Sequence, residues 1–406
     1  MGFEQGLSGL NAASKSLDVI GNNVANSSTV GFKESQAQFA DVYASSMAGS
    51  SGGQAGIGVR VATVAQQFSQ GNITTTNNSL DMAISGSGFF RMDNNGSITY
   101  SRNGQFQLDK NGLIVDNQGN KLTGFLPNAA GVIVATTPAD IQISTADLLP
   151  RPTANVTAGL NLDARLTQPA VAPFNPNNSA TFNNSTSSTI YDSLGGAHTA
   201  SLYFVKGAVA NNWSAYLTVD GTQVGAGALT PMTFSTSGVL TAPVAAVTSA
   251  SFTPTGGGAP QTLAFDFAGT SQFGSSFGVN SLSQDGYTSG HMTGFSTGSD
   301  GIVTGRYSNG QTKTLAQVVL ANFSNDQGLQ PLGNNQFAET STSGTPLVGV
   351  PGSASLGLLQ TSATEDSNVD LTAELVNMIT AQRAYQANAQ TIKTQDQILQ
   401  TIVNLR

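Results

Sequence analysis

Histidine is the side chain that most often transfers protons near neutral pH, and this chain of 406 residues has only two, His198 and His291. With a serine and an aspartate close by, either could act as the general base for a serine nucleophile. No motif in the sequence places such partners beside them, and an ordinary surface or strand histidine is by far the commoner case. We therefore predict no catalytic role for either residue.

Two further patterns suggest chemistry without completing it. Gly86–Gly88 (GSG) is half of a dinucleotide-binding fingerprint, but aromatic β-type residues follow where the fingerprint needs a helix. Asp93, Asp109 and Asp116 could suggest a cation site, yet Asp109 and Asp116 lack metal-loop spacing and their place beside turns explains them. The absence of cysteine excludes disulfides and thiol catalysis and disfavours structural zinc. The sequence thus predicts no enzyme, no cofactor and no metal site.

The overall composition excludes further classes of protein. Charged residues make up 9 % of the chain and the formal net charge is −8, without a Lys/Arg cluster, which argues against nucleic acid as a partner. The sequence contains no run of about eighteen apolar residues, so it predicts no membrane-spanning helix. The first residues, MGFEQGLSGLNAASK, lack the basic region and apolar core of a secretory signal. We expect any export to proceed without a cleaved signal peptide.

The elements that could position functional residues begin with two heptad patterns at the ends of the chain. From Ser367 to Arg406 an apolar residue recurs every seven positions without an interrupting Gly or Pro, which predicts a long helix packed against another helix. Ser367 and Asp370 can cap its first amides. The residues of this predicted seam are Leu371, Met378, Tyr385, Ile392 and Leu399.

The start of the chain carries the matching pattern. Its apolar positions step by four and three residues through Phe3, Leu7, Leu10, Leu17 and Val24, with Ser14 and Gly21 as small members. The sequence therefore predicts paired, coiled-coil-like N- and C-terminal helices. Two interpretations remain open: a helical hairpin that caps a β domain, or helices that contact neighbouring copies of the same chain.

The chain between the helices is predicted to be mostly β. Phe32–Met47 reads as a short amphipathic segment, and Val59–Phe68 as a strand. Leu80–Phe125 predicts an antiparallel meander, because Asn95-Gly96, Asn103-Gly104, Asn111-Gly112 and Gln118-Gly119 are turn dipeptides between short β-type runs. Sparse charge and new strand patterns then predict a second β domain inserted into the first.

These patterns together predict a nested organisation. We expect 1–30 and 366–406 to form a terminal helical domain, which is a polymerisation domain on the second interpretation, and 31–70 a connecting segment with a Gly/Ser hinge. The first β domain is expected at 71–150 and 285–365, and the inserted outer β domain at 151–284.

Two motifs near the ends of the chain resemble a known family. IGNNVANSSTVGFK (Ile20–Lys33) and SNVDLTAELVNMITAQRAYQANAQTI (Ser367–Ile392) closely resemble the N- and C-terminal signatures of the flagellar rod and hook axial proteins. LDMAISGSGFFRM (Leu80–Met92) and YSRNGQFQLDKNGLIVDNQGNKLTGF (Tyr100–Phe125) look like the first β module of that family. The inserted region resembles it only by position and composition.

This resemblance implies a function in the bacterial flagellum. It implies an extracellular hollow tube built from copies of the chain, with the paired helices in its inner part and the β domains outward. Rod, hook cap and hook–filament junction proteins would be partners, and the flagellar export apparatus would secrete the chain. The inserted domain favours a hook subunit, a universal joint that passes torque from rod to filament, over a distal rod subunit. A secreted β-rich adhesin or fimbrial subunit is the alternative from a different class.

Seven residues of the two signatures stand out: Asn22, Asn23, Asn26, Gly31, Phe32, Gln382 and Arg383. The asparagines fall where the first helix should end, and Asn suits a helix stop because it tolerates left-handed backbone and bonds freed backbone groups. Gly31 permits a sharp reversal, with Phe32 as the anchor of the loop. Arg383 is either solvated or hydrogen-bonded to a neighbouring subunit.

Overall fold

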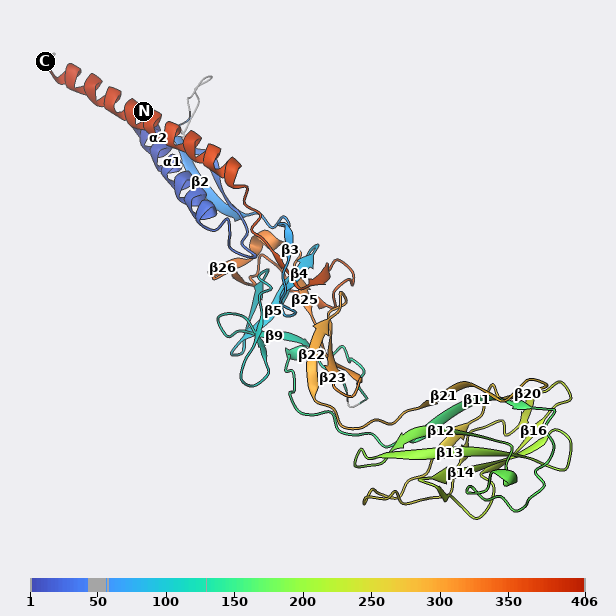
Figure 1. Cartoon of the computed structure of the whole chain (residues 1–406). Helices are drawn as coiled ribbons and strands as arrows, with labels where there is room; N and C mark the ends of the chain where they lie inside the picture. The colour runs from blue at the N-terminus through green and yellow to red at the C-terminus, as the bar shows by residue number, and fades with distance from the viewer. Residues whose placement is uncertain (1, 43–55, 57, 129, 405–406) are drawn as a thin grey trace. The chain divides into compact units, whose positions relative to one another are not determined.

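The computed structural model describes residues 2–42, 56, 58–128 and 130–404 (Figure 1). The predicted fold class is confirmed: the chain is mostly β, with one α-helix at each end. It divides into two compact units. Unit 1 comprises 1–144, 294–305 and 312–406, and unit 2 comprises 145–293 and 306–311. Among the residues that the structure describes, no helix is long and apolar enough to cross a bilayer.

The terminal part of unit 1 consists of α1 (Gly2–Ala25), β1 (Ser35–Val42), β2 (Gly58–Gln66) and α2 (Leu371–Asn404). Asp370 caps α2 as predicted, because its Oδ1 accepts hydrogen bonds from the amides of Thr372 and Ala373 at 2.9 and 3.1 Å. The helix thus begins four residues after Ser367. The predicted strand at Val59–Phe68 is confirmed as β2.

The segment after α1 differs from its expected form. Phe32–Met47 was expected as one amphipathic segment, but Ser35–Val42 forms strand β1, antiparallel to β2 from the pair Ser35–Gln66 to the pair Val42–Gly58. Half-buried and exposed residues nearly alternate along it, which is the period of a strand and not of a helix. Residues 43–47 and most of the predicted hinge lie outside the described residues.

The β part of unit 1 centres on one sheet with the path β24-β9-β5-β6-β27-β26. Its core packs Phe89, Tyr100, Phe323 and Phe337, whose rings meet edge to face. The strands are β3 (Ile73–Thr75), β4 (Met82–Ser85), β5 (Phe89–Asn94), β6 (Ser97–Ser101), β7 (Gln107–Leu108), β8 (Ile114–Val115), β9 (Lys121–Phe125), β10 (Ala139–Asp140), β22 (Met292–Thr297), β23 (Ile302–Tyr307), β24 (Thr312–Val318), β25 (Leu320–Asn322), β26 (Gln330–Gly333), β27 (Gln336–Ala338), β28 (Leu347–Gly349), β29 (Leu358–Thr361) and β30 (Ala363–Glu365).

Three of the four predicted turns of the meander are confirmed, at Asn95-Gly96, Asn111-Gly112 and Gln118-Gly119, where each glycine has a positive φ. The turn at Asn103-Gly104 was predicted wrongly: β6 does not pair with β7 but with β5 and the distant β27. Gly104 serves instead as a point of close approach, since a Cβ there would overlap the Met82 carbonyl oxygen.

Unit 2 has its own core between two sheets, β12-β13-β14-β16-β17 and β18-β19-β11-β20, the latter extended by β21. Trp213, Phe204 and Phe265 lie fully buried in this core. The strands are β11 (Asn155–Asp163), β12 (Asn184–Tyr191), β13 (Ala197–Lys206), β14 (Asn212–Val219), β15 (Thr222–Gln223), β16 (Thr230–Phe234), β17 (Leu240–Ala242), β18 (Val247–Thr248), β19 (Ala264–Asp266), β20 (Ser271–Phe273) and β21 (Gly278–Gln284).

Candidate functional site

The two terminal helices lie side by side and antiparallel (Figure 1). Near the start of α1, a Cβ added to Gly6 would lie 3.0 Å from Ile392 Cγ1, and one added to Gly9 would lie 2.8 Å from Asn388 Oδ1. Near the end of α1, the Asn23 side-chain amide lies 3.5 Å from the Glu374 carboxylate. The start of α1 therefore meets the later part of α2, and its end meets the first turns of α2.

Small residues form the first half of the face of α1 that meets α2, and Val19 and Ile20 are buried further along the helix. Gly6, Gly9, Ala13 and Ser16 recur at steps of three and four, and Ala381 is the buried residue opposite the later part of this face. Small side chains allow the helices to approach closely, but they bury little apolar area. Because the stabilisation scales with that area, the contact between the two helices is weak on its own.

The β1–β2 hairpin packs on another side of α1. Gln5 Nε2 donates a hydrogen bond of 2.6 Å to the Gly56 carbonyl, and the Val59 amide donates one of 3.3 Å to Ser8 Oγ. A Cβ at Gly58 would overlap Ser8 Oγ, so the hairpin sits directly against the helix. We call α1, α2 and this hairpin the arm.

The predicted seam residues lie mostly beside the α1–α2 contact and not in it. The contact positions of α1 are one residue out of phase with the predicted heptad, which leaves Phe3 and Leu7 46 % and 44 % exposed. Leu10, Leu17, Val24, Met378 and Ile392 are half-buried, whereas Leu371, Tyr385 and Leu399 are exposed. The spacing of small residues along α1 is the sequence signal that would have identified its inner face.

An apolar stripe on the first turns of α2 has no cover within the described chain. It comprises Leu371, Leu375, Val376 and Ile379, each 45–58 % exposed, and we call it the outer stripe. Ile398, Leu399 and Val403 are exposed near the other end of the same helix. Exposed apolar side chains that cluster on one face of a helix are typical of interaction sites.

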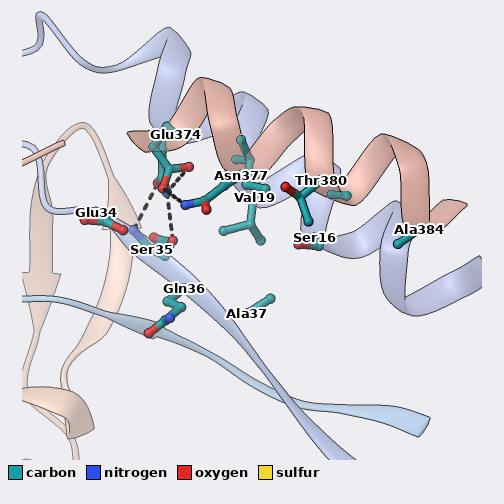
Figure 2. Close-up of a pocket in the computed structure, with 13 residues that line it drawn as sticks. Ser16, Val19, Glu34, Ser35, Gln36, Ala37, Glu374, Asn377, Thr380 and Ala384 are labelled. Atoms are coloured by element: carbon teal, nitrogen blue, oxygen red, sulfur yellow. Dashed lines mark hydrogen bonds between the residues drawn. The ribbon is translucent and has the colours of Figure 1, made fainter. Parts of the chain in front are cut away.

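A groove of about 330 Å³ runs between α1, α2 and β1 (Figure 2). Glu374 is buried at one end of it, where its carboxylate accepts a 3.3 Å hydrogen bond from Asn377 and lies beside Asn23. Burial and the negative charges of Glu374 and Asp370 raise the pKa of Glu34, which lies on the same groove. The groove therefore has an acidic end and a small-residue end around Ala381 and Ala384.

The asparagines of the N-terminal signature end α1 and attach β1 to it. Asn23 is 1 % exposed. Its side-chain Nδ2 donates a hydrogen bond of 2.8 Å to the Ser35 carbonyl, and its Oδ1 accepts one of 3.0 Å from the Ser35 N–H. Asn26 donates to the Asn22 carbonyl and side chain at 2.9 and 2.8 Å. Helix α1 ends at Ala25, as these residues predicted.

Gly31 makes the reversal that its residue type predicted. Its φ is +71°, and a Cβ there would lie 2.6 Å from the backbone nitrogen of Asn103. The Gly31 amide donates a 2.7 Å hydrogen bond to the Glu365 carbonyl. The neighbouring Phe32 is half-buried. The loop after α1 is therefore pressed against both the β sheet and the strand that precedes α2.

A buried ionic cluster, which we call the root cluster, joins the arm to the β part of unit 1. Glu365 bonds Lys33 Nζ through Oε1 at 2.6 Å and Arg102 through Oε2 at 3.2 Å. The Lys33 and Glu365 side chains have no exposed surface. Lys33 also donates to the Ser69 carbonyl, and Arg102 donates to the Gly86 carbonyl. Sequence reasoning missed this cluster, since its members are far apart in the chain.

The root cluster has more positive than negative charge. Burial lowers the pKa of both Lys33 and Arg102, although Glu365 opposes the shift in each case. Asp326 lies near Arg102. Burial raises the pKa of the Asp326 carboxyl group, although the positive charge of Arg102 acts to lower it. Glu365 is thus the single anion in direct contact with two buried cations.

The remaining candidates are surface, turn and strand residues. Gln382 and Arg383 are exposed on α2. Asp93, Asp109 and Asp116 accept hydrogen bonds from the backbone amides of their own turns, which is the turn chemistry expected of them. Within the described ranges, no group of three or more acidic or histidine side chains is placed to hold a metal ion. His291 is an exposed residue beside Asp147, and His198 is a strand residue between two aspartates.

Four family models match successive parts of the chain. They are "Flagella basal body rod protein" (residues 3–33), "Flagellar hook protein FlgE/F/G D1 domain" (83–156), "Flagellar basal body protein FlaE D2 domain" (161–287) and "Flagellar basal body rod FlgEFG protein C-terminal" (360–405). The first and last cover α1 and α2, and the third lies within unit 2.

Complete proteins show the same similarity. The chain is 44 % identical to the flagellar hook protein FlgE of Escherichia coli and 42 % identical to that of Salmonella typhimurium, over all of each chain. It is 32 % identical to that of Borreliella burgdorferi over 99 % of this chain and 98 % of the relative. The crystal structure of the Helicobacter pylori flagellar hook protein FlgE2 shares the fold, with a TM-score of 0.52 at 15 % identity over 72 % of this chain and all of that one. The chain belongs to the flagellar hook protein family.

Proposed function

We propose that this chain is the structural subunit of the bacterial flagellar hook, where it polymerises into a flexible hollow tube that passes torque from rod to filament. The observation that carries the proposal is the full-length similarity to hook proteins, which includes the inserted β domain. That similarity supports the hook over the two alternatives, a distal rod subunit and a secreted adhesin.

The arm is the proposed polymerisation element. Its inner contact uses small residues, whereas the outer stripe and Phe3 and Leu7 stay exposed in the single chain. Burying one large apolar side chain contributes about 1.5–3 kcal/mol. Contacts with neighbouring copies of the chain, which would bury these side chains, would therefore stabilise the arm more than its inner contact does. Arg383 and Gln382, exposed beside this surface, are proposed to bond a neighbouring subunit.

The domain roles follow from this assignment. We propose that 1–30 and 366–406 build the inner wall of the tube, with 31–70 as their connection to the first β domain at 71–150 and 285–365. The inserted domain at 151–284 would face outward. Rod, hook cap and hook–filament junction proteins are the proposed partners, and export would use the flagellar apparatus without a cleaved signal peptide.

Electron microscopy of the purified chain tests the function directly. The full chain should assemble into tubes of uniform diameter, and a chain that ends at Asp370, without α2, should stay monomeric with both β regions folded. The adhesin alternative predicts instead that assembly survives the loss of α2. Secretion by a strain without its own hook gene, followed by recovery of hooks and motility, separates the hook from the distal rod.

A further inference from the structure

His198 lies at the base of unit 2, between two turns. It is the second residue of β13, and it is 7 % exposed. Its Nδ1 lies 2.6 Å from Asp220 Oδ2, in the turn that follows β14, and its Nε2 lies 3.3 Å from Asp192 Oδ2, in the turn between β12 and β13. One imidazole ring therefore bridges the two turns. The loop after β18 contacts the same two turns, since Thr255 donates to Asp220 and the Ala259 amide donates to Ser193 Oγ.

A protonated ring satisfies both contacts as hydrogen bonds, whereas a neutral ring satisfies one. Backbone amides already bond both aspartates: Leu194 and Gly196 donate to Asp192, and Thr199 donates to Asp220. Such carboxylates are ionised and can only accept hydrogen bonds. A neutral imidazole has one N–H and one lone pair, so it can satisfy one carboxylate and must present its lone pair to the other. An imidazolium donates to both.

The turn held by Asp192 contacts the segments through which the chain enters and leaves unit 2. A Cβ at Gly195 would lie 3.0 Å from Pro150 Cβ and 3.2 Å from Thr288 Oγ1. Next to this turn, Tyr191 and Thr153 exchange hydrogen bonds of 2.9 Å. A movement of the Asp192 turn would therefore change its packing against the segments around Pro150 and Thr288.

We propose that His198 is a proton-dependent lock at the base of the inserted β domain. As an imidazolium it holds both turns. When it loses its proton it keeps the shorter hydrogen bond, to Asp220, and releases Asp192 and the turn that packs against the entry and exit segments. The lock is independent of the polymerisation proposed for the arm.

The electrostatic balance supports this assignment. Burial alone would lower the pKa of His198, but the hydrogen bonds and charges of Asp220 and Asp192 outweigh it and raise the pKa above its ordinary value. Burial would likewise raise the pKa values of Asp192 and Asp220, yet amide hydrogen bonds and His198 lower both. Within the described part of the chain, the charged groups that act on His198 are these two aspartates, and the loop that reaches Asp220 contributes the neutral Thr255.

The sign of the pH dependence follows. A histidine whose pKa is raised on folding stabilises the fold fully below its unfolded pKa, near 6.5, and loses that contribution as the pH rises through its folded pKa. The aspartates, whose pKa values are lowered, contribute above about pH 4 and lose their contribution as the pH falls further. The lock should therefore be strongest at mildly acidic pH and open on the alkaline side.

This chain allows a clean test because it has two histidines, no cysteine and one tryptophan. Trp213 lies in the core of unit 2, so its fluorescence reports urea unfolding of that unit. In the full chain, the urea midpoint of unit 2 should be lower at pH 9 than at pH 6. The folding equilibrium constant should fall about tenfold for each pH unit by which the pKa of His198 in the folded chain exceeds that in the unfolded chain. His291→Gln, which removes the exposed histidine, should keep this dependence, and His198→Gln should remove it.

NMR of the ¹³C-histidine-labelled chain gives a second readout that needs no change at His198. In His291→Gln the one remaining histidine signal belongs to His198, and it should titrate at higher pH in the folded chain than in the same chain unfolded in urea. A His198 signal that titrates at the same or lower pH in the folded chain than in the unfolded one overturns the lock, as does an unfolding midpoint that is the same at pH 6 and pH 9. Should His198→Gln not fold, the titration still decides.

Discussion

Glu365 shows how one residue can hold two distant parts of the chain. Its carboxylate contacts two buried cations, and its backbone carbonyl accepts from Gly31. A buried ion pair gives little net stability compared with an apolar replacement, but removing one partner leaves an uncompensated buried charge. The members of the root cluster should therefore differ in how much their loss costs.

Glu365→Gln should destabilise unit 1 strongly, by about 3–5 kcal/mol, because Lys33 and Arg102 would both stay buried without a counter-charge. Lys33→Met should be much milder, since it leaves the pair of Glu365 and Arg102 balanced. Differential scanning calorimetry measures the effect, and Trp213 fluorescence identifies the transition of unit 2, which should not move. Equal losses for the two variants would contradict this account of the charge balance.

Gly31 and Gly21 form a matched pair of glycines for the N-terminal signature. Gly31→Ala should cost about 1–3 kcal/mol or more, because the backbone has a left-handed φ and the new Cβ would meet the backbone of Asn103. Gly21→Ala, in helix α1 with open space around the added Cβ, should instead stabilise the helix by about 0.5–1 kcal/mol. Calorimetry and far-ultraviolet circular dichroism of the two variants test the difference in sign.

At the scale of elements, the sequence of the arm clearly predicts the helices α1 and α2, but the contact between these two helices is weak. Small residues fill much of the inner face of α1, and apart from the buried Val19 and Ile20 the large apolar residues of this helix stay half-buried or exposed. Long helices depend on tertiary packing for their stability. The isolated chain should therefore open its arm easily while the root cluster stays closed.

Trypsin can measure this difference, because the basic residues of the arm and of its root differ in burial. At low protein concentration, cleavage should occur early at Lys15, Arg383 and Lys393, which are exposed on the helices, and late at the fully buried Lys33. Assembly into tubes should protect all four sites. Mass spectrometry of the fragments gives the order of cleavage, and early cleavage at Lys33 would show that the root opens together with the helices.

The elements also show what the sequence could and could not predict. The seven-residue repeat and the Asp370 cap specified α2, because helix period and capping are local properties. The sequence of Phe32–Met47 was ambiguous because a short amphipathic run is compatible with either a helix or a strand. In the structure, pairing with β2 makes Ser35–Val42 a strand. The root cluster could not be predicted, since pairing Lys33 with Glu365 depends on the tertiary fold. The phase of the α1 contact was missed because large apolar residues were favoured over small ones.

At the scale of the whole molecule, the chain places its two terminal helices in one arm and a separate hydrophobic core in the inserted unit 2. Unit 2 buries Trp213, Phe204 and Phe265 within its own two sheets, so its stability does not need the arm. A subunit built in this way can change its contacts at the arm without unfolding its β regions. Assembly defects and folding defects should therefore be separable by mutation.

The outer stripe provides that separation. Ile379 is 51 % exposed in the single chain, so Ile379→Asp should leave the fold of both units intact. In a polymer that buries the stripe, an unpaired charge there would cost more than the roughly 1.5–3 kcal/mol that the isoleucine contributes. Because each added subunit repeats the contact, even about 1.4 kcal/mol raises the critical concentration for assembly about tenfold.

Gln390→Asp is the matched control, since it adds the same charge at an exposed polar position of the same helix. Sedimentation of purified chain at increasing concentration gives the critical value for each variant, and Trp213 fluorescence verifies that unit 2 is folded. In cells, secreted protein must be measured beside motility, because failed export would imitate failed assembly. If Ile379→Asp assembles at the same concentration as Gln390→Asp and the parent chain, the outer stripe is not an assembly contact, and the contacts between subunits must involve other surfaces.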